Sequence, residues 1–411
     1  MFSAAPPRPD FSLRGAGGWL LAAWLLIACW PAAQAQDLPP PEAPEAWLLT
    51  YGPGDVYWQR FGHNAIWLRE PNGLDHTFNF GFFDFDQENF ILNFVQGRLL
   101  YFAAAVEAER ELAFYRDEGR SIRAQRLDLG PAEYAQLRAY LVNHVRPENR
   151  EYLYDYYLDN CSTRLRDAID LALGGALAQQ FRGQPGTMSY RDHTRRSTQS
   201  DLAYYLGLEL GLGMPVDHPT DRWGEMFLPA MLADNLNRLD LRDGRPLIVE
   251  DLLLEAGTVP PAALQPALTW PRYGLFGLIL LLLLLGSMAL RQSPPTITIS
   301  LTLAWLLVTG TIGLGLTLVW GYTDHAFTHP TANLFLFNPL WLLAVVPMLR
   351  KPVAALMLVG LVAAVMNATW PGGQYLDDLL VLAGPVNLVV ALLLWQGFRP
   401  AAGPRPVPAD G

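Results

Sequence analysis

Cys161 is a thiol whose position in the sequence fits a nucleophile. The chain has two cysteines, and Cys29 lies in an N-terminal apolar segment that resembles an export signal. After removal of that segment Cys161 would have no disulfide partner within the chain, and an unpaired thiol in an exported protein is typical of a reactive residue. Apolar residues at helical spacing follow Cys161, and Asp159 or Asn160 precedes it as a candidate N-cap. This pattern predicts Cys161 in the first turn of a helix, where the helix dipole and Arg164 favour a thiolate.

A thiolate nucleophile needs a base within hydrogen-bonding reach, and His63 is the best placed of the seven histidines. Alternating residues after His63 predict a strand, and the turn at 71–73 (PNG) predicts a hairpin whose returning strand, 77–82, carries Asn79. Asn79 would then lie next to His63 and orient the imidazole, as the third member of a catalytic triad does. Four other histidines fit turns, helix ends or polar loops: His76, His144, His193 and His218. The histidines lack ligand spacing, so we expect neither a metal nor a cofactor.

The elements that must position these residues begin with a targeting segment. Residues 1–36 combine a basic residue, an apolar run at 19–30 and small residues at 33–35, which predicts a cleaved signal peptide. Lipidation of Cys29 is the alternative interpretation of the same segment. The globular part, 37–270, is rich in Asp and Glu, which argues against binding of nucleic acid.

The C-terminal part, residues 271–398, is almost entirely apolar. It holds five runs, each close to the roughly 20 residues that cross a bilayer: 273–290, 299–320, 334–349, 353–370 and 379–395. Basic residues gather at alternate loops and in the tail at 399–411, which places these parts in the cytoplasm. We therefore predict a multi-pass protein of the bacterial inner membrane with its large N-terminal domain in the periplasm and its C-terminus in the cytoplasm.

The loop between the second and third runs is unusually polar. Its candidate substrate-binding residues are His325, His329, Asn333 and Asn338. Polar groups at the edge of a membrane are costly unless they are used. We expect this loop to contact a lipid head group or to close on the globular domain, with simple solvation as the alternative. The aromatic residues of 78–94 are interpreted first as core and second as the lining of an acyl path.

Motifs that follow one another over most of the mature chain resemble those of the Lnb family of bacterial envelope proteins. They are GPGD (52–55), FGH (61–63), FNFGFFDF (78–85), EGR (118–120), PENR (147–150), DNCSTRLRD (159–167), YRD (190–192), LGLG (210–213), MFLP (226–229), TDH (323–325) and NP (338–339). One departure is Ser162, where the family typically has threonine. Because the matches keep their order along the chain, the resemblance is specific.

The resemblance implies an α+β fold, namely a circularly permuted papain-like domain in which the histidine strand precedes the cysteine helix, followed by about five transmembrane helices. It also implies lipoprotein N-acyltransferase activity with Cys161 and His63 as the catalytic pair. An acyl chain would pass from a phospholipid donor, through a Cys161 thioester, to the N-terminal amine of a diacylglyceryl cysteine. Asn160, Arg164 and the N–H groups of the first helical turn would support the nucleophile and the oxyanion.

Two other functions fit the same residues. A cell-wall cysteine amidase or peptidase would use the Cys161–His63 pair with water as the acceptor. A non-enzymatic envelope scaffold would retain its function when Cys161 is replaced. The membrane segments favour a lipid substrate, because they place the globular domain beside lipids.

Overall fold

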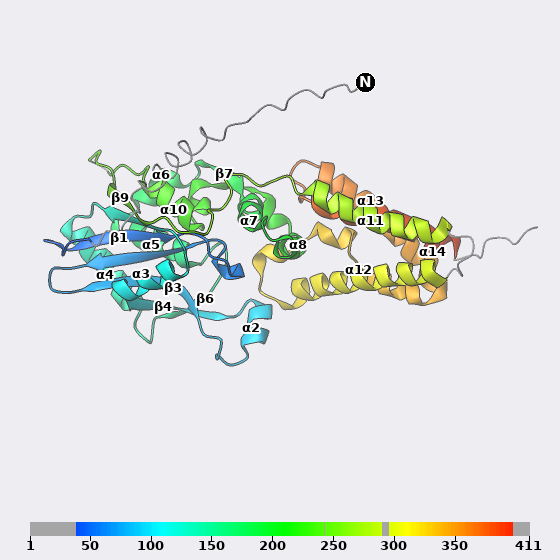
Figure 1. Cartoon of the computed structure of the whole chain (residues 1–411), viewed down its shortest axis with the longest axis horizontal. Helices are drawn as coiled ribbons and strands as arrows, with labels where there is room; N and C mark the ends of the chain where they lie inside the picture. Colours follow the sequence, from blue (N-terminus) through cyan, green and yellow to red (C-terminus); the bar gives the residue numbers. More distant parts are fainter. Residues whose placement is uncertain (1–37, 242, 290–295, 398–411) are drawn as a thin grey trace, which may run out of the picture.

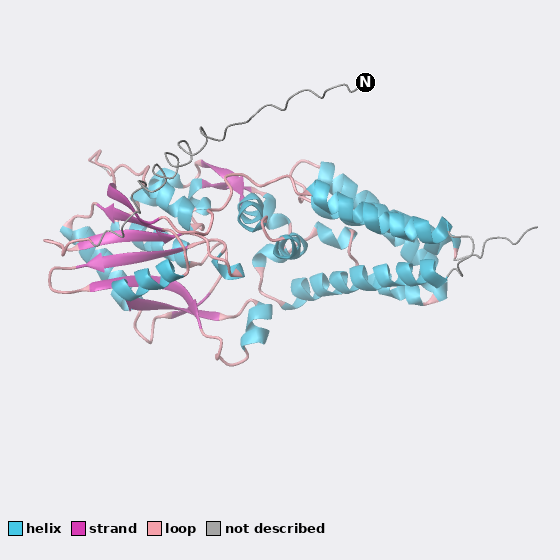
Figure 2. Cartoon of the chain, in the orientation of Figure 1, coloured by secondary structure: helices cyan, strands magenta, loops and turns pink. Residues whose placement is uncertain are grey.

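The chain divides into an α+β domain and a helical bundle, seen in the computed structural model of Figures 1 and 2. The structure describes residues 38–241, 243–289 and 296–397. The predicted signal peptide at 1–36, Cys29 within it and the tail at 399–411 lie outside the described residues. The α+β class predicted for the N-terminal part is confirmed.

A seven-stranded antiparallel sheet forms the centre of the N-terminal domain, in the order β6-β4-β3-β2-β1-β5-β9. Its strands are β1 (Glu45–Tyr51), β2 (His63–Arg69), β3 (Asp75–Phe83), β4 (Leu100–Glu107), β5 (Ile122–Leu127), β6 (Glu151–Leu153) and β9 (Ile248–Glu255). The predicted hairpin is present, and Ala65 of β2 lies opposite Asn79 of β3. Two shorter strands, β7 (Pro185–Ser189) and β8 (Pro219–Asp221), pair separately.

Helices cover both faces of this sheet. The helices of the domain are α2 (Phe90–Gln96), α3 (Ala108–Asp117), α4 (Pro131–His144), α5 (Cys161–Ala172), α6 (Ala176–Phe181), α7 (Tyr190–Thr198), α8 (Leu202–Gly211), α9 (Arg222–Glu225) and α10 (Pro229–Leu236). Alternate residues of a strand point to opposite faces. Leu48 of β1 therefore packs in one core with α4 and α5, whereas Trp47 and Leu49 pack in another with α3. His63 is the first residue of β2, Asn79 lies within β3 and Cys161 is the first residue of α5.

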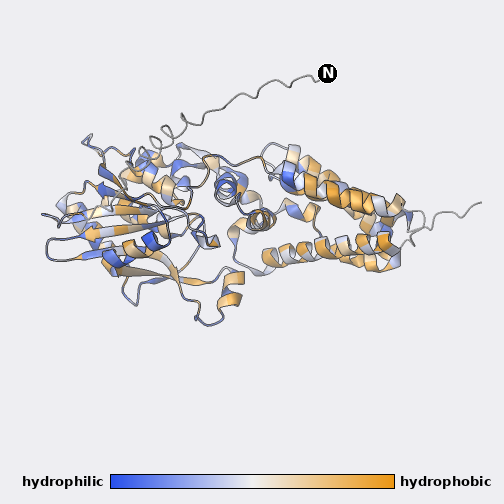
Figure 3. Cartoon of the chain, in the orientation of Figure 1, coloured by the Kyte–Doolittle hydropathy of each residue, from blue (hydrophilic) through white to orange (hydrophobic). Residues whose placement is uncertain are grey.

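Four helices of the described residues are long and apolar enough to cross a membrane. They are α11 (Trp270–Ala289), α12 (Thr296–Tyr322), α13 (Arg350–Thr369, extended by a preceding turn from Pro347) and α14 (Asp377–Gln396). In Figure 3 the ribbons of these helices are mostly orange, the colour of hydrophobic residues. The second, fourth and fifth predicted spans correspond to α12, α13 and α14, and the first corresponds to α11, which begins three residues earlier than predicted.

The predicted third span, 334–349, is wrong as a transmembrane α-helix. It forms the short 3-10 helices η4 (Ala332–Phe335), η5 (Pro339–Val345) and η6 (Pro347–Leu349). The two prolines have no N–H to donate and each starts a new 3-10 segment, which prevents one continuous helix. The segment still runs along α12, since Asn338 lies beside Gly313 and Leu342 beside Gly310.

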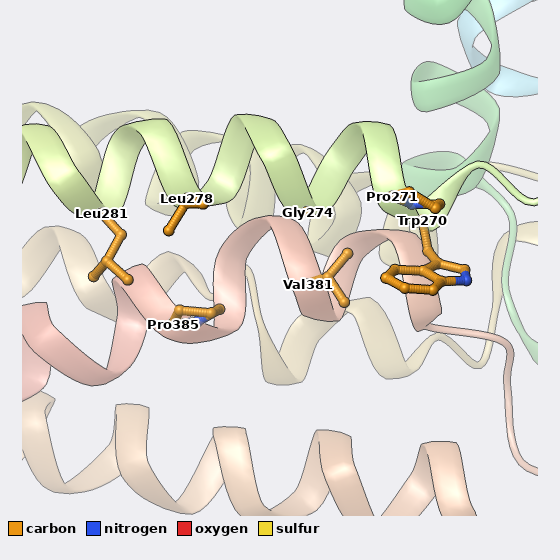
Figure 4. A pocket seen from close by; sticks show the side chains of 7 residues that line it. All are labelled: Trp270, Pro271, Gly274, Leu278, Leu281, Val381 and Pro385. Atoms are coloured by element: carbon orange, nitrogen blue, oxygen red, sulfur yellow. The ribbon is translucent and has the colours of Figure 1, made fainter.

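A small residue allows α11 and α14 to approach closely. A Cβ added to Gly277 of α11 would lie 2.5 Å from the carbonyl oxygen of Val381 and 2.6 Å from that of Leu382. Beside this contact the two helices border an apolar groove of about 430 Å³ (Figure 4). Pro385 of α14 lines the groove and cannot donate to the carbonyl of Val381. Close helix contact at small residues is a common way to pack helices in a membrane.

Candidate active site

Cys161 is the first residue of α5, as predicted. Asn160 is the N-cap, and its Oδ1 accepts from the N–H of Thr163 at 2.9 Å. The Asn160 amide nitrogen donates to the carbonyl oxygens of Tyr156 at 2.8 Å and Phe227 at 2.9 Å. Both ends of this side chain are therefore engaged in fixing the start of the helix. Asn160 positions the nucleophile, and its amide is not free to hold an oxyanion.

His63 opens β2 and faces both Cys161 and Asn79. Its Nε2 lies 2.9 Å from Oδ1 of Asn79, and its ring shares a hydrogen bond with the Cys161 thiol. Because Nε2 is used by Asn79, Nδ1 is the ring nitrogen that remains for the thiol. The structure thus brings together the three residues that the sequence predicts as nucleophile, base and orienting group.

Burial and charge act in opposite directions on the Cys161–His63 pair. Burial alone raises the pKa of the Cys161 thiol, but the charge and hydrogen bond of His63 and the N–H of Asn64 bring that pKa below its ordinary value. Burial alone lowers the pKa of His63, but the charge of Cys161 and hydrogen bonds with Cys161 and Asn79 raise it. Each group therefore stabilises the charged form of the other, which favours a thiolate–imidazolium pair.

Glu111 of α3 is a buried carboxylate behind this pair that the sequence analysis missed. It accepts a hydrogen bond of 2.7 Å from Nδ2 of Asn79, another from Thr77, and one of 2.7 Å from the hydroxyl of Tyr51. Burial and the Glu111 charge raise the pKa of Tyr51 well above its ordinary value, so this hydroxyl stays a donor. Tyr51 also stacks on the His63 ring, with centroids 6.1 Å apart.

Asn64 joins the start of α5 to the sheet. Its Oδ1 accepts from the Ser162 hydroxyl at 2.8 Å, and its amide donates to Thr50 Oγ1 at 2.9 Å. These groups are buried, so each hydrogen bond replaces one to water that the fold removes. The network fixes Cys161 against the strand that carries His63.

Arg164, expected to support the nucleophile by its charge, has its contacts with Asp159 and Tyr152. Its guanidinium makes two hydrogen bonds to the Asp159 carboxylate, of 2.6 and 2.7 Å, and lies 3.7 Å from the centroid of the Tyr152 ring. The Asp159 carboxylate thus forms an ion pair with the arginine. Arg164 therefore supports the loop that precedes Cys161.

The polar loop after α12 closes on the N-terminal domain. His325 Nε2 lies 3.2 Å from the carbonyl oxygen of Val95. The N–H of Asp324 donates to the carbonyl oxygen of Gln96 at 2.9 Å. The Phe327 ring packs against Tyr157, with centroids 4.6 Å apart. Of the two uses expected for this loop, contact with the globular domain is present.

The other three candidate residues of this region also have local partners. Asn333 donates to the carbonyl oxygens of Glu209 and Leu210 at 2.9 and 2.8 Å, which ties α8 to the bundle. Asn338 caps η5, and the His329 ring lies 6.3 Å from that of Trp320. Asn333 thus contacts the junction between the domain and the bundle, whereas Asn338 and His329 contact other residues of the C-terminal part rather than Cys161 or His63.

His193 was expected in a polar loop, and this expectation is wrong. It lies in α7, where His193 Nε2 is 3.0 Å from Oε1 of Glu225 and both side chains are fully buried. Arg191 is equally buried and paired with Glu209 and Asp217. Arg191 can be buried because opposite charges lie within hydrogen-bonding distance, and His193 because Glu225 is its hydrogen-bond partner.

Comparison with known proteins identifies the N-terminal part. Residues 34–198 match the family model described as the Lnb N-terminal periplasmic domain. This range contains His63, Asn79, Glu111 and Cys161. No curated protein and no solved structure matches the chain.

Proposed function

Because this chain belongs to the Lnb family, we propose that it is a membrane-anchored thiol acyltransferase that N-acylates bacterial lipoproteins. The observation that carries the proposal is the hydrogen-bonded series Cys161–His63–Asn79, in a domain joined to four helices of membrane-spanning length. Such a series is the arrangement that activates a thiol for acyl transfer. The helices of membrane-spanning length support a site close to lipid esters and lipid-anchored amines.

In the first half-reaction the Cys161 thiolate attacks the ester carbonyl carbon of a phospholipid. The carbonyl oxygen becomes an oxyanion, which the unpaired N–H groups of the first turn of α5 would hold. The ester C–O bond then breaks, and the His63 imidazolium gives its proton to the departing alkoxide of the lysophospholipid. The products are a Cys161 thioester and a neutral imidazole.

In the second half-reaction the α-amino group of a diacylglyceryl cysteine attacks the thioester. Neutral His63 takes a proton from the attacking nitrogen as the C–N bond forms and the C–S bond breaks. The products are the N-acyl amide and the original thiolate–imidazolium pair. Asn79 keeps the imidazole in one orientation through both steps, which its hydrogen bond to Nε2 supports.

The fold and topology that go with this function are also proposals. The order of β2 before α5 supports a permuted papain-like domain, because the histidine strand precedes the cysteine helix. If the 3-10 segment 334–349 is counted as a crossing beside the four helices, the end of α14 at Gln396 would lie opposite the periplasmic domain, which supports a cytoplasmic C-terminus. The membrane is then the bacterial inner membrane, since the N-terminal domain is periplasmic.

The proposal is tested in bacteria that lack their own lipoprotein N-acyltransferase. We expect the wild-type chain to add one acyl chain to the lipoprotein N-terminus, measured by mass spectrometry, and Cys161→Ser and His63→Ala to abolish this product. His218→Ala, in an exposed histidine of the same domain, is the matched control and should keep it. Unmodified diacyl lipoprotein with the wild-type chain would refute the activity. A changed muropeptide profile in those cells would then favour an amidase. If Cys161→Ser keeps the function of the wild-type chain in the cell, a scaffold is favoured.

A further inference from the structure

Helix α2 exposes apolar side chains to an extent that a water-soluble surface does not explain. None of its seven residues is buried, and the side chains of Ile91, Leu92, Phe94 and Val95 are 70, 54, 56 and 51% exposed. Scattered apolar residues are normal on a protein surface, but contiguous ones mark a contact with another apolar phase. Helix α2 therefore has a partner of that kind.

The exposed surface continues from α2 to the end of β3 and the residues beside it and forms one aromatic patch. We define this patch by Trp58, Phe83, Phe85, Phe90 and Phe94. The Phe83 ring lies 4.9 Å from Phe85, 6.1 Å from Phe90 and 6.2 Å from Trp58, centroid to centroid. Trp58 and Phe85 are both more than half exposed. The aromatic rings thus form a continuous surface and not a closed core.

The position of α2 relative to the membrane helices is fixed by hydrogen bonds. The carbonyl oxygens of Val95 and Gln96 accept from His325 and Asp324, which follow the last residue of α12, Tyr322. Arg98 adds an ion pair to Asp324. Figure 1 shows α2 beside the end of α12 that lies nearest the sheet. Helix α2 is therefore at the depth at which α12 leaves the membrane.

Aromatic residues mark that depth independently. Exposed Trp and Tyr side chains gather at the membrane-water interface of spanning proteins. In this chain they occur at the ends of α11, α12 and α13 and before α14: Trp270, Trp320, Tyr322, Trp370 and Tyr375. Asp324 comes two residues after Tyr322, and its N–H donates to the carbonyl oxygen of Gln96. Helix α2 therefore lies at the level of these aromatic residues.

We infer that α2 and the aromatic patch insert into the periplasmic leaflet and contact phospholipid acyl chains. An α-helix fits this environment because its backbone groups are satisfied internally, and a short apolar helix can lie in the interface. The exposed Asp84, Asp86 and Glu88 precede the helix in a loop, so they stay at the level of the polar head groups. The occupant is the bilayer itself.

The aromatic patch also leads toward the thiol, a step that rests on the proposed function. A Cβ added to Gly81 of β3 would lie 3.6 Å from the Cβ of Cys161. Phe83 follows two residues later on the same strand, about 7 Å along it. The patch thus connects the leaflet with the nucleophile, and we assign to it the entry of the donor acyl chain.

Membrane insertion is measured without any activity assay. A nitroxide is attached at Ile91→Cys, or at Phe94→Cys as a second position, in full-length protein carrying Cys29→Ser and Cys161→Ser. The protein is placed in nanodiscs of phosphatidylethanolamine and phosphatidylglycerol. We expect oxygen, which concentrates in lipid, to collide with these labels several-fold more than a water-soluble nickel chelate does. Leu253→Cys on β9, 63% exposed at the far edge of the sheet, is the control and should show the opposite preference.

Two outcomes would overturn the inference. Labels at 91 and 94 that collide with the nickel chelate as the Leu253 label does would place α2 in water. Labels that neither reagent reaches would show that protein covers the aromatic patch.

The role in acyl entry has its own measurement. Ile91→Glu with Phe94→Glu should lower thioester formation on Cys161 from vesicle phospholipid by about tenfold or more, since each apolar side chain then loses its contact with lipid. Leu253→Glu should leave the rate unchanged. An equal rate for the double variant would remove the entry role. Absence of any thioester in the wild-type chain would instead refute the proposed function and leave the measured depth of α2 intact.

Discussion

The amide nitrogen of Asn79 lies 2.7 Å from Oε2 of Glu111, which determines which way the Asn79 amide points. A carboxylate only accepts, so the NH₂ group must face Glu111 and Oδ1 must face His63. A carbonyl oxygen also only accepts, so His63 Nε2 must carry a proton. Nδ1 is then the position that exchanges a proton with Cys161. Glu111 is separated from the thiol by Asn79 and His63. Its carboxylate thus determines which nitrogen of His63 carries the proton.

Glu111→Gln should lower the rate of thioester formation by about tenfold, the scale seen when outer partners of a functional histidine are removed. A glutamine amide can accept or donate, so it no longer forces the orientation of Asn79. Because the lost charge also helps to raise the His63 pKa, the alkaline limb of the pH–rate profile should move to lower pH. Tyr51→Phe removes a bond to Glu111 but keeps the charge, and should leave that limb in place. An unshifted profile in Glu111→Gln would contradict the positioning role.

The alkylation of Cys161 should reveal the thiolate–imidazolium pair. In the wild-type chain the pKa of Cys161 is below the ordinary 9.0, so reaction with iodoacetamide should continue at pH values where a free thiol is protonated. His63→Ala removes the positive charge and leaves the burial, which by itself raises the pKa. The midpoint of the rate against pH should therefore move upward. Equal midpoints in the two proteins would show that His63 does not stabilise the thiolate.

Asn160 should contribute to stability through its cap. Asn160→Ala removes the acceptor for the Thr163 N–H and should lower the free energy of unfolding by about 1 kcal/mol for the cap alone. Its amide also donates to two backbone carbonyls, so the total loss should exceed that figure. Asn160→Ser keeps a capping oxygen, so its free energy of unfolding should lie between those of the wild-type chain and Asn160→Ala. Thermal unfolding of the three proteins measures the order, and an equal loss for Ser and Ala would exclude the cap.

Gly277 should be essential to the packing of α11 on α14. In Gly277→Leu the new side chain would meet the carbonyl oxygens of Val381 and Leu382 at distances that no real Cβ contact allows, so the helices must separate. We expect a lower unfolding temperature in detergent. Gly286→Leu, on the same helix with open space around it, is the matched control and should have little effect. Equal effects of the two substitutions would argue against this contact.

The central pair could be predicted because the signals that place it are local. Asn160 and the apolar spacing after Cys161 predicted the helix start, and the hairpin placed Asn79 beside His63. Glu111 could not be predicted, since it lies on a helix with other acidic residues and nothing in the sequence distinguishes it from a solvated one. Only the packing of α3 on the sheet brings it to Asn79.

Charged and apolar patterns led to two wrong predictions, a polar loop around His193 and a transmembrane α-helix at 334–349. Arg191 and His193 lie in a charged stretch that is typical of a solvated loop, but in the interior Glu209 pairs with Arg191 and Glu225 is hydrogen-bonded to His193. The run 334–349 has the composition of a span, but its two prolines divide it into 3-10 segments. In both cases the outcome depends on groups distant in the chain or on backbone hydrogen bonding, which composition does not express.

The last strand of the sheet, β9 (Ile248–Glu255), pairs with β5 (Ile122–Leu127) and is followed closely by α11, which starts at Trp270. A chain that crosses the membrane N-terminus first exposes the edge of β5 until β9 has emerged, and an open edge can pair with other chains. The sheet is therefore completed only when the first membrane helix is already entering the secretion channel. Completion of the N-terminal domain and integration into the bilayer would then be one timed event during biosynthesis.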